Sequence, residues 1–170
     1  TTWPAQPLLD TVPVVGVALG ACAGQGAIKV LSSHFSVRVR EQAQVMAAGP
    51  HVVLQAYGQA IDKNELGGHR VHRKSALVHN GAVDEADALA QVRRFLSYLP
   101  PNAWTPAPRS PVEGCGPIEP DPSIRSVVPT ERKRGYDMRR LLAKLCDPDS
   151  FFELRPTIGR NLTAGFARID

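Results

Sequence analysis

The sequence lacks most of the residue patterns that mark a particular chemistry. Its three cysteines, Cys22, Cys115 and Cys146, are widely spaced and form no CxxC pair. That spacing argues against a zinc site and favours reduced thiols in a cytosol-like compartment. Aromatic residues make up only 6% of the chain and are not interleaved with arginine, so nothing favours a nucleic-acid ligand. The sequence also contains no obvious pair of acid and base residues.

Long apolar runs are missing as well. The longest, residues 12–23, is too short to span a membrane and is interrupted by Pro13. No lysine or arginine precedes it, so we do not expect a signal peptide. Hydrophobic and charged contents of 43% and 21% are typical of a globular protein, and the net charge of +4 suits anionic metabolites. Because the chain begins without Met and ends in an apolar segment, we expect a piece of a longer protein.

What the sequence does contain is a strand, a glycine-rich turn and a helix start between Val12 and His34. Residues 12–19 are rich in β-branched side chains and predict a buried strand. Glycines follow at 20, 24 and 26, after which apolar residues recur at helical spacing. A helix that starts within residues 24–27 would direct free backbone N–H groups toward one point. Such a point favours an anion or a developing oxyanion.

The known glycine-rich motifs do not match this turn. No Gly-Lys-Ser/Thr follows at the spacing of a phosphate-binding loop, and Gly24-Gln25-Gly26 lacks the third glycine of a dinucleotide fingerprint. The centre of residues 22–26 is Gly24, not the serine of a nucleophile elbow. A backbone oxyanion site is one remaining interpretation. Close packing of strand against helix through small residues is the other.

Further along the chain, residues 35–40 alternate apolar and polar side chains, which predicts a half-exposed strand. His69, His72 and His79 follow in a basic segment, but no carboxylate or cysteine completes a metal-ligand set. We expect no metal there and interpret residues 69–79 as a polar loop or the rim of a substrate site. The nearby Arg70, Arg73 and Lys74 either meet phosphate groups or form a solvated basic face.

The organisation of the chain changes at a proline-rich segment. Residues 84–99 predict a helix with Asp84 as N-cap and an apolar stripe through Leu89, Phe95 and Leu96. Residues 100–122 then hold eight of the fifteen prolines, which predicts a linker without regular structure. We therefore expect residues 1–99 and 123–170 to belong to two different packing units.

These segments together resemble the carboxyltransferase (β) subunit of biotin-dependent acyl-CoA carboxylases, of the propionyl-CoA and methylcrotonyl-CoA type. The resemblance covers nearly the whole chain. It rests on VPVVGVALGACAGQGA at 12–27, AGP at 48–50, ELGGHRVH at 65–72, VRRFLSYLP at 92–100, VVP at 127–129, YDMRRLL at 136–142, SFFEL at 150–154 and GFAR at 165–168.

The resemblance implies an α/β fold of the crotonase-like type, a spiral of ββα units. It implies that residues 1–99 form the end of an N-terminal carboxyltransferase domain and that residues 123–170 begin a C-terminal one. The implied activity is transfer of CO₂ from carboxybiotin to the α-carbon of an acyl-CoA through an enolate. The implied partners are a biotin carboxylase or biotin carboxyl carrier subunit and further copies of the chain, in the cytoplasm or the mitochondrial matrix. No membrane or nucleic acid is implied.

The resemblance also assigns residues in the glycine-rich turn. By motif match, the backbone N–H groups of Gly24 and Gln25 hold the enolate oxygen of the thioester. Gln25 departs from the family, in which many members carry a second glycine at this point. A non-catalytic remnant of the fold acting as an interaction module, and a crotonase-type hydratase or isomerase, are the alternative interpretations. The YDMRRLL and SFFEL segments argue against the hydratase.

Overall fold

The computed structural model describes residues 5–109, 121–159 and 161–169 of the chain. The helices are α1 Ala5–Leu9, α2 Gln25–Leu31, α3 Pro50–Tyr57, α4 Lys63–Gly67, α5 His69–Ser75, α6 Glu85–Ser97, α7 Ile124–Val127 and α8 Met138–Leu145. The strands are β1 Val15–Ala18, β2 Ala21–Ala23, β3 Phe35–Val39, β4 Gln44–Met46, β5 Asn80–Ala82, β6 Phe152–Leu154 and β7 Ala164–Phe166. No helix in the described part of the chain combines the length and apolarity that a membrane span requires.

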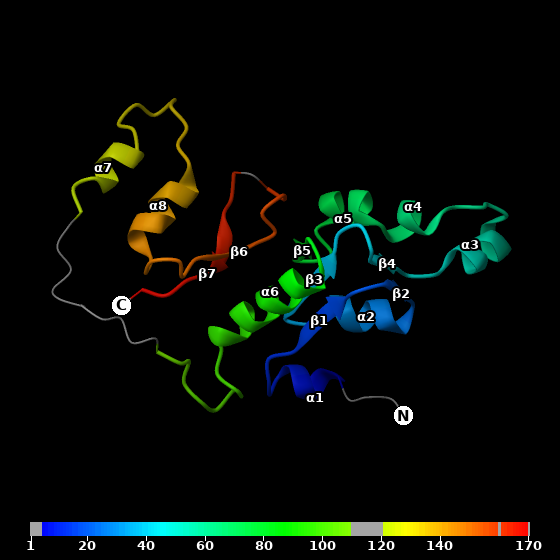
Figure 1. Cartoon of the computed structure of the whole chain (residues 1–170). Coiled ribbons are helices and arrows are strands. Elements are labelled where there is room, and N and C mark those ends of the chain that lie inside the picture. The colour runs from blue at the N-terminus through cyan, green and yellow to red at the C-terminus, as the bar shows by residue number, and fades with distance from the viewer. Residues whose placement is uncertain (1–4, 110–120, 160, 170) are drawn as a thin grey trace.

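Three parallel strands in the order β1-β3-β5 form the largest sheet, with α6 crossing it and α2 beside β1 (Figure 1). A second, two-stranded parallel sheet pairs β2 with β4, whereas β6 and β7 pair antiparallel. Strands come in consecutive pairs along the chain, β1 with β2 and β3 with β4, and at least one helix separates the two members of every parallel pairing, as parallel pairing requires. The predicted α/β fold is confirmed, and α2 starts at Gln25, within the predicted residues 24–27, but the predicted glycine-rich turn contains the short strand β2. β1 is shorter than the predicted residues 12–19.

The hydrophobic core lies between the main sheet and α6. Phe35 stacks on Phe95 of α6 with ring centroids 4.9 Å apart, and Phe152 of β6 meets Phe35 edge-on at 5.5 Å. A second cluster of small and branched side chains fills the space between α2 and the two parallel sheets: Ala18, Ala27, Val30, Ala43, Val45 and Val78. The glycine-rich turn is therefore fixed between packed elements.

The expectation that residues 35–40 form a half-exposed strand is wrong. β3 is buried along its whole length because it is the central strand of the sheet and has covered faces on both sides. Its apolar side chains face the α6 core, whereas Ser36 is 0% and Arg38 3% exposed on the other side. Their hydrogen bonds to His79 and His69 replace contact with water. Apolar and polar side chains alternate along β3 as the sequence predicts, but the polar face is covered by other parts of the chain.

The α6 helix begins as predicted. The Asp84 side chain accepts a hydrogen bond from the Asp87 N–H at 2.8 Å, which caps the helix. Its buried residues are Ala88 and Phe95, while Leu89 and Leu96 are 45% and 40% exposed. The predicted apolar stripe is therefore wider than the face that the core covers.

The described residues 101–109 and 121–122 contain no helix or strand, and the rest of the predicted linker lies outside the described residues. The chain after the linker returns to the first core, because Phe152, Leu154 and Phe166 pack against it. This contact differs from the expectation of two separate packing units. The boundaries 1–99, 100–122 and 123–170 stay a prediction.

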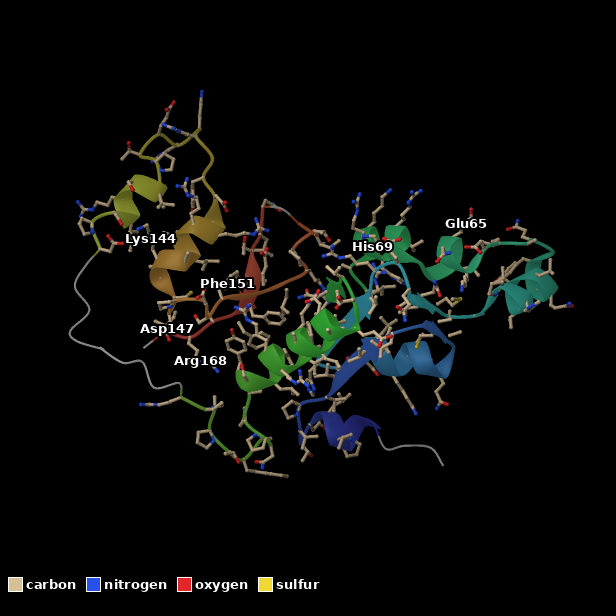
Figure 2. All side chains as sticks on the ribbon, viewed as in Figure 1. Glu65, His69, Lys144, Asp147, Phe151 and Arg168 are labelled. Atoms are coloured by element: carbon tan, nitrogen blue, oxygen red, sulfur yellow. The ribbon has the colours of Figure 1, made fainter. Side chains whose placement is uncertain are left out.

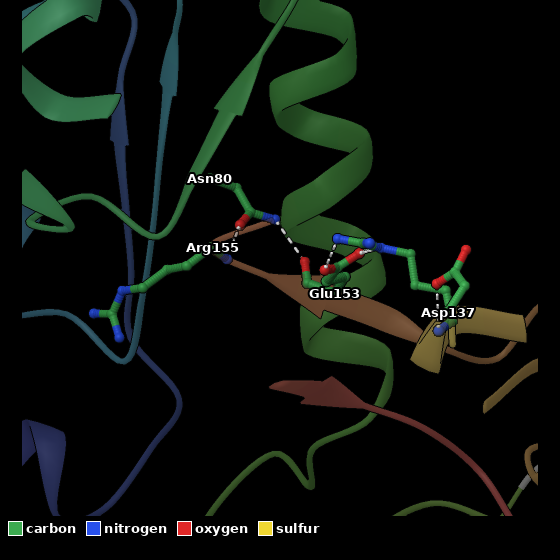
Figure 3. A network of polar contacts seen from close by, with 5 residues as sticks. Asn80, Asp137, Glu153 and Arg155 are labelled. Carbon is green, nitrogen blue, oxygen red and sulfur yellow. Dashed lines mark hydrogen bonds and ion pairs between the residues drawn. The ribbon is translucent and has the colours of Figure 1, made fainter. Parts of the chain in front are cut away.

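A polar network reinforces the same junction (Figure 3). Asn80 of β5 donates to the carbonyl of Glu153 at 3.1 Å and accepts from the N–H of Arg155 at 3.0 Å. The Glu153 carboxylate in turn accepts two hydrogen bonds from Arg139 of α8, at 2.6 and 2.7 Å. The Asp137 carboxylate accepts from the N–H of Arg139 and caps α8. One continuous set of hydrogen bonds thus joins β5, β6 and α8.

Candidate functional site

The glycine-rich turn carries the chain from β2 into α2. Gly24, the residue directly before the helix, has φ 58° and ψ −127°. Residues with a side chain rarely adopt this combination, whereas glycine does so readily. Position 24 therefore needs glycine for the direction of the backbone, independently of any ligand.

The N–H groups of this turn differ in their bonding. The Gly24 N–H donates to the carbonyls of Met46 at 3.2 Å and Ala47 at 3.1 Å. Gln25 is the first residue of α2, and the first N–H groups of a helix have no carbonyl within the helix to bond. Gln25 thus presents a backbone donor directly. Gly24 can do so only by giving up its bonds to residues 46 and 47.

The side chain of Gln25 does not disturb the turn. Gln25 is not among the residues with positive φ, which besides glycines are Ala76, Asp149 and Arg155 among the described residues. Its side chain is exposed. Glutamine in place of a second glycine is therefore compatible with the backbone geometry at this position.

An apolar cavity of about 310 Å³ lies next to the start of α2. Gln25 and Ile28 of α2 form one wall, and Val15 of β1 and Leu8 of α1 contribute others. The volume lies at the lower end of the range of small-molecule sites, roughly 300–1,000 Å³. Gln25 therefore belongs both to the start of α2 and to the lining of an apolar cavity.

Close packing, the second interpretation of the glycine-rich stretch, applies to a different glycine. A Cβ on Gly16 would lie 2.6 Å from the carbonyl oxygen of Val30 and 2.7 Å from its Cα. Gly16 therefore lets β1 and α2 approach each other, whereas Gly24 turns the chain. The two interpretations describe two different glycines in the same stretch.

The histidine-rich segment is only partly the polar loop that the sequence predicts, because residues 69–75 form α5 and residues 76–79 connect it to β5 without helix or strand. His72 of α5 is buried, with Nε2 2.6 Å from the carbonyl oxygen of Val45 and Nδ1 3.1 Å from the Ser75 hydroxyl. The hydrogen bond between His72 and Val45 holds α5 against β4. No group of three or more histidine, cysteine, aspartate or glutamate side chains among the described residues is arranged to hold a metal.

Two other histidines lie beside arginines, His69 beside the buried Arg38 and His79 beside the exposed Arg155, an arrangement that sequence reasoning missed. Burial lowers the pKa of His69 first, and the Arg38, Arg40 and Arg73 charges lower it further, partly offset by Glu41. Burial and then Arg155 lower the pKa of His79. The only indication of this arrangement in the sequence is Arg38, a charged residue that stands between two valines in a predicted strand.

Neither described cysteine has a disulfide partner. Cys22, in the strand before the turn, is half-buried, and burial raises the pKa of its thiol. Cys146 is also a free thiol, and Cys115 lies outside the described residues. A raised pKa keeps Cys22 protonated and therefore weakly nucleophilic.

Comparison with known proteins agrees with this architecture. The family model of the carboxyl transferase domain matches residues 6–170. The biotin-dependent acetyl-/propionyl-coenzyme A carboxylase beta5 subunit of Mycobacterium tuberculosis is 34% identical over 94% of this chain, and the mitochondrial propionyl-CoA carboxylase beta chain of Sus scrofa is 32% identical over 94%.

The chain spans about 30% of the length of each of these relatives. Among solved structures, the transcarboxylase 12S hexamer with methylmalonyl-coenzyme A and methylmalonic acid bound has a TM-score of 0.84 and 30% identity. That match covers 95% of this chain and 31% of the transcarboxylase chain. The fold is thus the crotonase-like fold of the carboxyltransferases, and the chain belongs to the carboxyl transferase domain family.

Proposed function

We propose that this chain is part of the carboxyltransferase component of a biotin-dependent acyl-CoA carboxylase, which carboxylates the α-carbon of an acyl-CoA through an enolate. The observation that carries the proposal is the position of Gln25, which is the first residue of α2 and also lines the apolar cavity. A hydrogen-bond donor next to an apolar pocket is what a thioester oxygen and its acyl chain require. Preorganised donors stabilise an oxyanion at little cost of reorganisation.

Gln25 and Gly24 have different roles in this proposal. The Gln25 N–H is the direct donor to the enolate oxygen. Gly24 supplies the positive φ with which the chain enters α2. It becomes a second donor only when a ligand replaces its bonds to the carbonyls of Met46 and Ala47. Those bonds are shared between two acceptors at 3.1 and 3.2 Å, which is near the long end of normal hydrogen bonds.

Biotin, carried on a partner subunit, supplies the carboxyl group and the base for the α-proton. The residues of this chain then have only to bind and orient the acyl-CoA and stabilise its enolate, which agrees with the lack of a paired acid and base. We infer that the partners are a biotin carboxylase or biotin carboxyl carrier subunit and further copies of the full-length chain. The inferred compartment is the cytoplasm, or the mitochondrial matrix in a eukaryote.

Replacing Gln25 with proline tests the donor itself. Proline has no N–H, yet it is favoured at the first position of a helix, so Gln25→Pro deletes the donor while leaving the helix start intact. Gln25→Ala is the matched control, because it removes the carboxamide and keeps the N–H. The assay is incorporation of labelled bicarbonate into a panel of acyl-CoAs by the full-length protein reconstituted with its biotin-carrying partner.

We expect Gln25→Pro to lower kcat about 10²–10³-fold, the usual cost of one oxyanion donor. Gln25→Ala and Gln25→Gly should stay close to the wild-type rate. Circular dichroism of all three variants establishes that the fold is retained. Near-normal turnover by a folded Gln25→Pro variant would refute the oxyanion assignment, and no carboxylation by the wild-type complex would favour a non-catalytic remnant.

A further inference from the structure

A second cavity, of about 470 Å³, opens beside β3 and β5 of the main sheet. Residues from β3, α5, β5 and α6 line it together with Pro156, Thr157 and Ile158 of the segment after β6. Figure 1 shows this segment reaching from β6 toward α5, and Figure 2 labels His69 at the start of that helix. The cavity shares no lining residue with the Gly24 turn or with the apolar cavity beside it.

The lining is strongly cationic. It contains four arginines, Arg38, Arg40, Arg73 and Arg94, and its described residues include no aspartate or glutamate. Arg40 donates to the carbonyl of Gly81 at 3.2 Å, and Arg94 donates to backbone carbonyls near β6. These acceptors are neutral, so the bonds position the guanidinium groups without cancelling their charge.

Arg38 is the centre of this arrangement. It is 3% exposed in the central strand, and its Nη2 donates to Nδ1 of His69 at 2.6 Å and to the His69 carbonyl at 3.3 Å. Its Nη1 donates to the carbonyl of Arg40 at 3.4 Å. Glu41 is near enough to act on the Arg38 charge, but no described carboxylate forms an ion pair with it. A buried cation without a counterion is costly, and an anion in the cavity would offset that cost.

The histidines present donors to the same space. Nδ1 of His69 accepts from Arg38, so the proton of the neutral ring is on Nε2. Nδ1 of His79 likewise accepts from the N–H of Ser36 at 3.1 Å, which leaves the proton of that ring on Nε2 as well. The Nε2 atom of His79 lies 3.3 Å from Nη2 of Arg155, which can only donate. The lining histidine His79 therefore directs a donor, not an acceptor, toward this exposed arginine, and an anion can accept from both.

Phosphate matches this lining better than a carboxylate does. A phosphate group carries up to two negative charges and more acceptor oxygens than the two of a carboxylate. Four guanidinium groups and no described carboxylate in the lining therefore favour a phosphate group over a simple carboxylate.

We propose that this cavity, centred on Arg38, binds a phosphate group, either as free phosphate or as part of a phosphorylated metabolite. The proposal does not depend on the carboxyltransferase assignment, because none of its residues belongs to the Gly24 turn. Its volume accommodates a group of metabolite size. The ligand would join β3, α5, α6 and the segment after β6, which are contributed by both sides of the proline-rich linker.

The test is binding of orthophosphate, adenosine 5′-phosphate and coenzyme A to the full-length protein, measured by calorimetry and by thermal shift at constant ionic strength. Arg38→Met removes the charge and keeps a side chain of similar length. Arg73→Ala removes a cation from the exposed rim of the cavity, and Arg70→Ala is its control, because Arg70 is an exposed neighbour on α5 that does not line the cavity. All variants retain the residues of the Gly24 turn.

We expect at least one of the three ligands to bind, with Arg38→Met raising its Kd about tenfold or more and Arg73→Ala raising it several-fold. Arg70→Ala should leave Kd unchanged. Without ligand, Arg38→Met should melt at or above the wild-type temperature, because an uncompensated buried charge is gone. If Arg38→Met does not fold, the comparison of Kd between Arg73→Ala and Arg70→Ala decides whether the ligand binds in this cavity.

The three ligands separate the sources of the phosphate group. Binding is assigned to this cavity only where Arg73→Ala weakens it and Arg70→Ala does not. By that criterion, orthophosphate binding assigns the site to the phosphate group itself, adenosine phosphate binding alone assigns it to nucleotides, and coenzyme A binding alone assigns it to a coenzyme A phosphate. Binding that is equally strong in the Arg73→Ala and Arg70→Ala variants, or the absence of binding by all three ligands, would overturn the proposal. Carboxylation by the reconstituted complex is read separately, so failure of this site is distinguishable from failure of the proposed function.

Discussion

The contact between the two sides of the proline-rich linker makes a quantitative prediction about Phe152. Its side chain is 6% exposed and lies edge-on to Phe35 and parallel to Tyr98, with ring centroids 5.5 and 6.4 Å apart. The Arg94 guanidinium lies over its ring, 5.5 Å from the centroid. Truncating a buried phenylalanine to alanine typically costs about 3–5 kcal/mol. We expect Phe152→Ala to lower the free energy of unfolding by about that amount.

A loss of this size is a large part of the stability of a typical domain, so Phe152→Leu, with a smaller expected loss, provides a second measurement. Trp104→Ala is the control, because that aromatic side chain is 80% exposed. Its truncation should change stability by no more than about 0.5 kcal/mol. The free energies come from urea denaturation followed by far-ultraviolet circular dichroism.

Hydrogen exchange then establishes whether the core is shared. If β6 and β3 belong to one cooperative unit, Phe152→Ala should reduce amide protection at Val37 and Val39 as well as in residues 150–168. If the linker separates two packing units, only the second region should lose protection. A loss of stability below about 1 kcal/mol, with protection of β3 unchanged, would refute the shared core.

Three further predictions concern glycines and histidines. Gly16→Ala should destabilise the protein by about 1–3 kcal/mol in the same urea assay, because the Cβ of the alanine would lie 2.6 Å from the Val30 carbonyl oxygen. An unchanged urea midpoint would contradict the close packing of β1 and α2. Gly24→Val should abolish carboxylation of acyl-CoA by the reconstituted complex, because φ 58° at position 24 excludes a β-branched residue. Carboxylation of biotin on the partner should stay intact. Normal turnover of acyl-CoA would show that the turn has no role in catalysis. The lowered pKa values of His69 and His79 predict that stability falls as the pH drops below about 6.5, because the unfolded chain then takes up protons that the folded chain resists. The measurement is the urea midpoint against pH for the wild type and for the double variant His69→Gln/His79→Gln. A sloping wild-type profile with a flat variant profile would support this prediction, and identical slopes would contradict it.

The sequence by itself determined the elements and the family. The apolar run before Gly20, the glycines after it and the cap at Asp84 depend on local backbone preferences, and these placed β1, α2 and α6 correctly to within a few residues. The motif at residues 12–27 also identified the carboxyltransferase family. Each of these predictions depends on neighbours in the chain, whose effects are local and therefore visible in sequence.

Only the tertiary structure decided which polar residues are buried and what each glycine does. The alternation in residues 35–40 was correct, yet it could not show that His69 and His79 cover the polar side of β3 and that Arg38 becomes a buried cation. Likewise, the sequence could not show that the Gly24 N–H is bonded to residues 46 and 47. These properties arise from contacts between segments far apart in the chain, and a local pattern carries no information about which segments will meet.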